Sequence, residues 1–243
     1  MEGKTMTSGA LYEGKSKTVY PGEREDECLI RFRDTATAFN GEKKEELQGK
    51  GRLNAEFSNL VFEFLAKNGV QTHLIKVVDE TSILAKKAEI VMVEVVVRNL
   101  AAGSFSKKYG VPEGTALRNT VLEFSLKSDE YGDPMMNETQ ITALGLAAQA
   151  ELDEMSRQAL RINGLLSGLL ARAGIKLVDF KLEFGRYQGG IILCDEITPD
   201  SCRFWDAGTH EKLDKDRFRL NLGGVLEGYQ NVLGRVRDVV RQV

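Results

Sequence analysis

The sequence predicts a two-lobed fold of strands and helices, with a strand-rich part over residues 1–98 and a part richer in helices over residues 99–243. Short alternating segments between glycine-containing turns are typical of the first part and predict antiparallel strands. The longest stretch of helical periodicity lies in the second part. At 243 residues the chain is long enough for two packed units with a cleft between them.

Within residues 1–98 we expect strands at 11–12 and 18–20, on either side of a small basic turn, and a third strand at 28–32 after a polar turn. A helix over 52–67 follows from apolar residues at helical spacing and from the Asn68-Gly69 stop. Two further strands are expected at 73–78 and 89–97.

The second part begins with a short helix and loop over 99–111 and a polar, proline-containing loop over 127–140. A long amphipathic helix is expected over 151–172, capped by Gly174. Strands at 176–184 and 190–195 follow, and the chain from residue 214 reads as helical.

Composition is that of an ordinary globular protein and argues against several partners. Hydrophobic residues make up 42% and charged residues 28% of the chain, and the net charge of −3 gives no basis for binding nucleic acid or a membrane surface. No apolar run approaches the roughly 20 residues of a membrane span, and residues 1–10 do not resemble a secretory signal. Three cysteines without CxxC spacing favour a reducing cytoplasm over a disulfide or zinc framework. His73 and His210 stand apart from each other, which favours structural roles over a metal site.

The segment 177–185, LVDFKLEFG, carries the strongest local signal for a polar site. Side chains alternate between the two faces of a strand, so Asp179, Lys181 and Glu183 share one face while the aromatic and leucine residues between them pack on the other. A solvated strand face with compensating charges is the alternative interpretation and has equal weight on this segment alone.

The next strand strengthens the functional interpretation. With a three-residue loop over 188–190, Tyr187 pairs with Ile191 and Glu183 lies opposite Asp195, about 5 Å away on the same face. Two such carboxylates repel unless a cation lies between them, and Mg²⁺ prefers one or two carboxylates together with phosphate oxygens. A loop one residue shorter would place Asp195 on the other face.

Two other segments are suited to binding anions. Residues 13–18, EGKSKT, combine a glycine with Lys15 and Lys17, which would contact a polyphosphate, although a solvated basic turn is the better interpretation in isolation. In residues 93–104 an apolar strand ends at Arg98 and leads through small residues to Ser104, an arrangement that can hold a phosphate or carboxylate, or can simply lie at the rim of a sheet.

Taken together, these segments resemble the phosphoribosylaminoimidazole-succinocarboxamide synthase (SAICAR synthetase) family. The two signatures of the family are matched by residues 93–104 and 177–185. Five further segments match in the expected order, so that the resemblance covers nearly the whole chain: 11–20, 33–41, 133–138, 195–206 and 213–219. One departure is Met92, where the family usually has proline, a residue that affects backbone shape rather than chemistry.

The resemblance implies an α+β, two-lobed fold, with an antiparallel N-terminal lobe similar to the nucleotide-binding lobe of protein kinases and a larger α/β C-terminal lobe. It also implies a reaction in which ATP, carboxyaminoimidazole ribonucleotide and L-aspartate give the succinocarboxamide, ADP and phosphate. A cytoplasmic homo-oligomer, preferably a dimer, is expected.

Site residues follow from the same resemblance. The ATP-binding residues implied are Lys15, Lys17, Val19, Lys86, Ile90 and Lys127. Those implied for the imidazole ribonucleotide are Asp34, Arg98, Ser104, Asp179 and Arg203. Magnesium would be held by Glu183 and Asp195, and the catalytic residues would be Asp179, Lys181 and Lys15.

A carboxylate is a poor electrophile towards an amine, so an acyl phosphate formed from ATP is the expected intermediate. Asp179 would help to remove a proton from the attacking amine. Two rivals share parts of this pattern. A kinase would turn over ATP without aspartate, and a nucleotide-sensing module would bind ATP without chemistry. The chain has all the residues that such a module could lose, which favours the ligase: Glu183, Asp195, Arg98 and Arg203.

Overall fold

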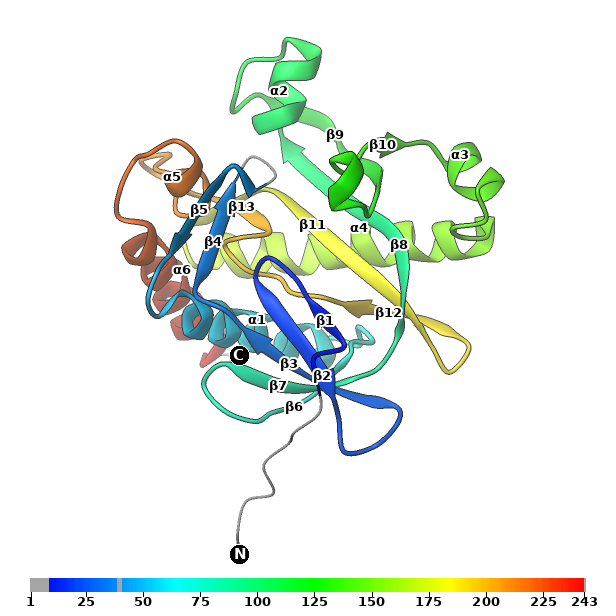
Figure 1. Ribbon diagram of the computed structural model, residues 1–243. Coiled ribbons are helices and arrows are strands. Elements are labelled where there is room, and N and C mark those ends of the chain that lie inside the picture. The colour runs from blue at the N-terminus through cyan, green and yellow to red at the C-terminus, as the bar shows by residue number, and fades with distance from the viewer. Residues whose placement is uncertain (1–8, 39–40, 243) are drawn as a thin grey trace, which may run out of the picture.

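The computed structural model describes residues 9–38 and 41–242 and shows an α+β fold (Figure 1). Most of the 1–10 segment considered above, and residues 39–40 of the 33–41 segment, lie outside the described residues. The strands are β1 Tyr12–Glu13, β2 Lys17–Pro21, β3 Glu27–Phe32, β4 Thr35–Ala38, β5 Lys43–Glu46, β6 Leu74–Val77, β7 Ser82–Lys86, β8 Glu89–Leu100, β9 Ala116–Leu126, β10 Met135–Met136, β11 Ile175–Tyr187, β12 Gly190–Cys194 and β13 Cys202–Asp206. The helices are α1 Lys50–Lys67, α2 Gly103–Tyr109, the 3₁₀ turn η2 Asp129–Tyr131, α3 Glu138–Ala143, α4 Gln149–Arg172, α5 Asp216–Arg219 and α6 Val225–Val240.

All strand pairs are antiparallel, and they form two main sheets. The first sheet has the order β1-β2-β3-β7-β6, and the second has the order β10-β9-β8-β11-β12, with β13 also paired to β11. Strands β4 and β5 form a separate hairpin. The predicted division between residues 98 and 99 falls inside β8, which ends at Leu100 and belongs to the second sheet. It is therefore not a boundary between the sheets, and as a division between lobes it stays a prediction.

Strand β11 is central to the second sheet. Residues 179–186 pair with β8, residues 183–187 pair with β12, and residues 175–180 pair with β13. Helix α4 lies across this sheet, and α1 and α6 pack beside it (Figure 1). One strand therefore pairs with three others, of which β8 is distant in the sequence.

The main core lies between the second sheet and these helices. In β8 the valines at positions 91, 93, 95 and 97 are fully buried, whereas Glu94 and Arg98 lie on the opposite face. In α4 the apolar stripe faces the same core, as helical periodicity predicts. Because the valine face of β8 packs against the apolar stripe of α4, the opposite face of the sheet remains available for polar side chains.

Most of the expected elements are confirmed within a few residues. The expected helices at 52–67 and 151–172 appear as α1 and α4, and Gly174 follows α4 with φ +67°. The expectation did not include the β4–β5 hairpin, the short strand β10, or β7, β9 and β13 of the two main sheets. Each of β7, β9 and β13 mixes polar with apolar residues, because its pairing partners and not its own periodicity stabilise it.

The predicted register of the β11–β12 hairpin is wrong. The loop has two residues, Gln188 and Gly189, with φ +50° and +80°, so Tyr187 pairs with Gly190 and Glu183 pairs with Cys194. A two-residue turn with both φ angles positive matches the twist of the flanking strands, which explains why the shorter loop forms. Asp195 consequently does not lie opposite Glu183 in the ladder.

No helix within residues 9–38 and 41–242 is long and apolar enough to cross a membrane.

Candidate active site

Lysines and carboxylates gather on the polar face of β11 and β8. Lys181 Nζ lies 2.6 Å from Glu94 Oε1 and 2.5 Å from Glu183 Oε1, and Lys127 Nζ lies 3.0 Å from the same Glu183 oxygen. The predicted alternation of β11 is confirmed, because Phe180, Leu182 and Phe184 are buried in the core. We call the following residues the charged cluster: Lys17, Glu94, Lys127, Lys181, Glu183, Asp195 and Glu196.

Asp195 enters the charged cluster through an unusual backbone conformation rather than through the ladder. Strand β12 ends at Cys194, and Asp195 has φ +61°, a left-handed conformation that aspartate adopts more readily than most residues. Its carboxylate forms an ion pair with Lys17, whose Nζ also lies 2.7 Å from Glu196 Oε2. The carboxylate thus reaches the lysines although the expected register is wrong.

Mutual attraction keeps these buried groups charged. Burial disfavours the ammonium of Lys17, but the carboxylates of Asp195 and Glu196 outweigh burial and raise its pKa above the usual value. Burial likewise disfavours the Asp195 carboxylate, yet Lys17 and Lys181 hold its pKa below the usual range. Glu94 differs, since burial dominates and raises its pKa in spite of Lys181.

An arginine pair, Arg98 and Arg203, lies beside the cluster and encloses Asp179. Arg98 Nη1 donates to Asp179 Oδ2 at 2.7 Å, and Arg203 Nη1 donates to the same oxygen at 2.9 Å. Arg98 also donates to Ser104 Oγ at 3.2 Å. The pairing of Asp179 with Arg98 across β11 and β8, and with Arg203 across β11 and β13, places both arginines on the face of the charged cluster.

Lys15 lies at the edge of the site. Its Nζ lies 2.6 Å from Asp129 Oδ1, and the side chains are 39% and 59% exposed, so solvent screens this ion pair strongly. Both residues line a cavity of about 310 Å³ together with Arg33 and Lys44. The three cationic side chains outnumber the two carboxylates of the lining, Glu13 and Asp129, so the cavity suits an anionic group.

The other implied residues have different surroundings. Asp34 accepts hydrogen bonds from the backbone nitrogens of Gly49 and Gly51, at 3.1 and 2.8 Å, and so binds the start of α1. Lys86 Nζ donates to the Thr72 carbonyl at 3.0 Å. Ile90 pairs with Gly185 in the second sheet, and half-buried Val19 packs against the smaller core of the first sheet: Cys28, Ile30, Phe32, Ala55, Ile83 and Ala85.

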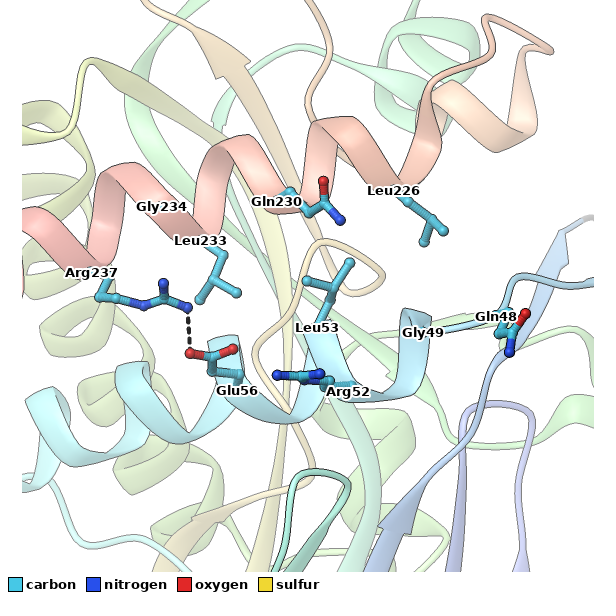
Figure 2. A pocket seen from close by; sticks show the side chains of 10 residues that line it. All are labelled: Gln48, Gly49, Arg52, Leu53, Glu56, Leu226, Gln230, Leu233, Gly234 and Arg237. Carbon is cyan, nitrogen blue, oxygen red and sulfur yellow. Dashed lines mark hydrogen bonds and ion pairs between the residues drawn. The ribbon is translucent and has the colours of Figure 1, made fainter.

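Another cavity lies away from this chemistry. It measures about 390 Å³ and lies between α1 and α6, where Arg52, Leu53 and Glu56 face Gln230 and Arg237 (Figure 2). None of its lining residues belongs to the charged cluster or the arginine pair. We therefore place the candidate active site by its ion pairs and not by the size of a hollow.

Several residues that contact the predicted ones were not singled out from the sequence: Ser16, Glu94, Glu123, Asp129, Glu196 and Asp216. Strand alternation would have found Glu94, since it shares a face with Arg98. Glu123 and Asp216 pair with the two arginines from other elements, and no local pattern marks them.

Within the described part of the chain, no group of three or more histidine, cysteine and acidic side chains is arranged to hold a metal ion. All three cysteines are free and buried. The donors available in the charged cluster are carboxylates already paired with lysines, a set that suits a cation accompanied by phosphate more than a closed protein cage.

Comparison with known proteins shows the family of the chain. Residues 10–236 match the family model described as SAICAR synthetase. The phosphoribosylaminoimidazole-succinocarboxamide synthase of Clostridium perfringens is 48% identical over 228 residues, which are 94% of this chain and 97% of that protein. The crystal structure of the enzyme of the same name from Ehrlichia chaffeensis has a TM-score of 0.93 at 42% identity and covers 94% of this chain and 98% of its own. A solved SAICAR synthetase in complex with ADP has a TM-score of 0.91 at 43% identity and covers 94% and 97%.

Fold and relatives together define a nucleotide-dependent ligase. The chain belongs to the SAICAR synthetase family. The expected two-lobed α+β fold is confirmed by the solved structures of this family.

Proposed function

We propose that this protein uses ATP to join L-aspartate to the carboxylate of carboxyaminoimidazole ribonucleotide, giving the succinocarboxamide, ADP and phosphate. The observation that carries this proposal is the single face of β11, where Asp179, Lys181 and Glu183 follow one another at every second position. Such residues are about 7 Å apart along a strand. A group bound at the arginine pair is therefore adjacent to one bound at the lysines.

On the nucleotide side, Lys17 and Lys181 would bind the phosphates of ATP, with Lys127 beside them and Lys15 at the outer edge. The ADP complex of a relative supports ATP as the co-substrate. The cavity lined by Lys15, Arg33 and Lys44 provides additional positive charge for a polyphosphate. Val19, Lys86 and Ile90 would line the adenine pocket.

The carboxylates of Glu183 and Asp195 fit a magnesium ion that arrives with the nucleotide. Both carry a negative charge among lysines, and Mg²⁺ prefers one or two carboxylates together with phosphate oxygens. When bound, the ion would neutralise charge on the phosphate being transferred. The lysines that now pair with these carboxylates would then be free to contact phosphate oxygens.

On the substrate side, Arg98, Arg203 and the hydroxyl of Ser104 would bind the anionic groups of the imidazole ribonucleotide. Guanidinium groups bind phosphate and carboxylate through parallel hydrogen bonds, and Asp179 fixes the orientation of both. Asp34 would support this region indirectly, through the start of α1.

Chemistry would proceed by activation of a carboxylate. Lys17 and Lys181 would hold the γ-phosphate of ATP next to the substrate carboxylate, and phosphoryl transfer would give an acyl phosphate. The amine of aspartate would then attack the acyl carbon and release phosphate. Two arginines donate hydrogen bonds to the carboxylate of Asp179, so we propose that its main role is to orient them. Removal of a proton from the amine is its second proposed role.

The test measures ADP and succinocarboxamide from the purified protein with Mg-ATP, while aspartate and the carboxylated ribonucleotide are omitted in turn. We expect both products only when both substrates are present. Equal release of ADP without aspartate would mean a kinase or ATPase and would overturn the proposal. Glu183→Gln should abolish turnover, whereas Glu113→Gln, which removes an exposed carboxylate paired with Lys212, serves as the matched control.

We further propose a cytoplasmic homo-oligomer, with a dimer preferred. Buried free thiols at Cys28, Cys194 and Cys202 are consistent with a reducing compartment. Light scattering coupled to size-exclusion chromatography would test the assembly, and a mass of about 27 kDa would contradict the dimer.

A further inference from the structure

The segment 195–203, which runs from the end of β12 into the first two residues of β13, contributes to both halves of the site. At its start Asp195 and Glu196 contact Lys17, and at its end Arg203 contacts Asp179. Any change in the shape of this segment would move a residue of the charged cluster relative to a member of the arginine pair.

In the middle of the segment, Asp200 is held by two helices. Its Oδ2 lies 2.6 Å from Lys50 Nζ and accepts a hydrogen bond from Asn54 Nδ2 at 2.8 Å, both from α1. Its Oδ1 accepts a hydrogen bond of 2.5 Å from the Tyr229 hydroxyl of α6. The side chains of Lys50 and Asp200 are 0% and 4% exposed, so water does not compete for these contacts.

The burial of Lys50 shows that this arrangement is specific. Its ammonium is fully buried, so its charge depends on the ion pair with Asp200. A buried ion pair adds little net stability compared with apolar residues of the same volume, whereas directed contacts define geometry. Packing alone would not require these residue types here.

A chain of backbone contacts leads from Asp200 to the charged cluster. The nitrogens of Ser201 and Cys202 both donate to the Thr198 carbonyl, at 3.0 Å, and form a tight turn around Asp200. The Ser201 carbonyl accepts a hydrogen bond from the Lys181 nitrogen at 2.9 Å. A shift of Asp200 would therefore reach the backbone of β11 at the position of Lys181.

Helix α1 also leads to the lysine turn, which comprises residues 13–18. Asp34 accepts a hydrogen bond from the Gly51 nitrogen at 2.8 Å, and the neighbouring Arg33 nitrogen donates to the Ser16 carbonyl at 2.8 Å. Ser16 lies between Lys15 and Lys17. The first turn of α1 thus contacts Asp200 on one side and the support of the lysine turn on the other.

We propose that Asp200 is a positioning residue, held by Lys50 and Tyr229, that aligns segment 195–203 with the lysine turn and so sets the distance between the nucleotide and ribonucleotide sites. This inference rests on the proposed function for its kinetic readout. Asp200 does not itself contact the reacting groups, and it acts through Asp195 and Arg203.

The test is Tyr229→Phe, which removes one hydroxyl and keeps the ring in the core. A displacement of about 1 Å between reacting groups can lower a rate by two orders of magnitude. We expect kcat to fall by at least about tenfold, while KM for ATP and for the ribonucleotide changes less than about threefold. Asp200→Asn should show the same split with a larger loss of kcat.

The matched control is Glu56→Gln. Glu56 of α1 pairs directly with Arg237 of α6, at the edge of the cavity between these helices (Figure 2). It should leave kcat unchanged. Equal kcat for Tyr229→Phe, Glu56→Gln and the unmodified protein would overturn the proposal, because Asp200 would then serve only to hold the helices together.

A crystal structure of Tyr229→Phe separates this proposal from the proposed function. If the unmodified protein makes no succinocarboxamide, the proposed function fails. The structure of the variant still tests whether Asp200 positions segment 195–203. Displacement of Arg203 relative to Lys17 would support the positioning role, and an unchanged segment 195–203 would refute it.

Discussion

Asp179 and Arg98 form an ion pair between neighbouring strands, with Asp179 Oδ2 2.7 Å from Arg98 Nη1 and both side chains at most 7% exposed. The same oxygen accepts a hydrogen bond from Arg203. The Asp179 carboxylate therefore bridges two guanidinium groups that the fold brings from separate strands, and Glu123 and Asp216 each pair with one of them as well. The arginines can present their remaining donors to an anionic substrate without being driven apart by their own charge.

Asp179→Asn should weaken both the fold and the site. Removing one partner of a buried ion pair typically costs about 3 kcal/mol, since the remaining charge is left without compensation. Arg98 keeps Glu123 and Arg203 keeps Asp216, so we expect a folded but less stable protein. Urea denaturation would measure the loss, and Glu113→Gln is the exposed control. An unchanged free energy of unfolding would contradict this account.

The pH–rate profile of the same variant separates the two roles of Asp179. If it removes a proton from the attacking amine, Asp179→Asn should eliminate the acidic limb of the kcat profile. If it only orients the arginines, the limb should persist while KM for the ribonucleotide rises. We expect the second result, because Asp179 is engaged by both arginines.

Magnesium should bind tightly only together with nucleotide. In the structure Lys17 occupies the Asp195 carboxylate, and Lys181 and Lys127 occupy that of Glu183. A cation must displace these ammonium groups from the carboxylates, unless bound phosphates pair with the ammonium groups instead. Calorimetric titration with MgCl₂ should therefore give at least about tenfold tighter binding with ADP present, a difference of about 1.4 kcal/mol. Asp195→Asn, which tolerates the left-handed backbone, should remove most of that difference.

Gln188→Asn should stabilise the β11–β12 hairpin. Gln188 has φ +50°, a left-handed conformation that costs most residues about 1–2 kcal/mol and asparagine less. We expect a gain of about 0.5 kcal/mol and a rise in Tm of about 1–2 °C. Gln188→Val should lower Tm instead, since a β-branched side chain suits this conformation least. A lower Tm for Gln188→Asn would show that the turn differs from the one described.

His73 should make the fold sensitive to acid. Burial, helped by the nearby charges of Lys17 and Lys86, lowers the pKa of this imidazole to about 3 from an ordinary value near 6.5. The unfolded chain then binds a proton that the folded protein does not, so stability is complete above about pH 6.5 and falls as the pH drops towards 3.

The predicted slope is at most about 1.4 kcal/mol per pH unit, and His73→Gln should remove it. Urea denaturation at pH 7 and pH 5 would measure the difference between the variant and the unmodified protein. His210→Gln, at an exposed position, is the control. Parallel losses in all three proteins would show that carboxylates elsewhere dominate the acid response.

Local periodicity was sufficient for much of the fold. The stripes of α1 and α4 and the alternation of β11 each follow from residues within one segment, because a helix or strand alone determines which side chains share a face. That alternation was enough to place Asp179, Lys181 and Glu183 together, and ordered motifs along the chain were enough to identify the family.

Tertiary structure alone decided how these faces meet. Arg98 and Asp179 are 81 positions apart, and Lys17 and Asp195 are 178 apart, so their pairing depends on register and packing across the whole core. The β11–β12 hairpin shows most clearly what the sequence did not determine. Its loop has two residues instead of three, so Asp195 does not lie opposite Glu183, and Asp195 contacts the lysines from a backbone conformation with φ +61°. A sequence determines which side chains share a face because that depends on local backbone geometry. Which faces come into contact depends on turns and buried contacts whose free energies are set by residues far away in the chain.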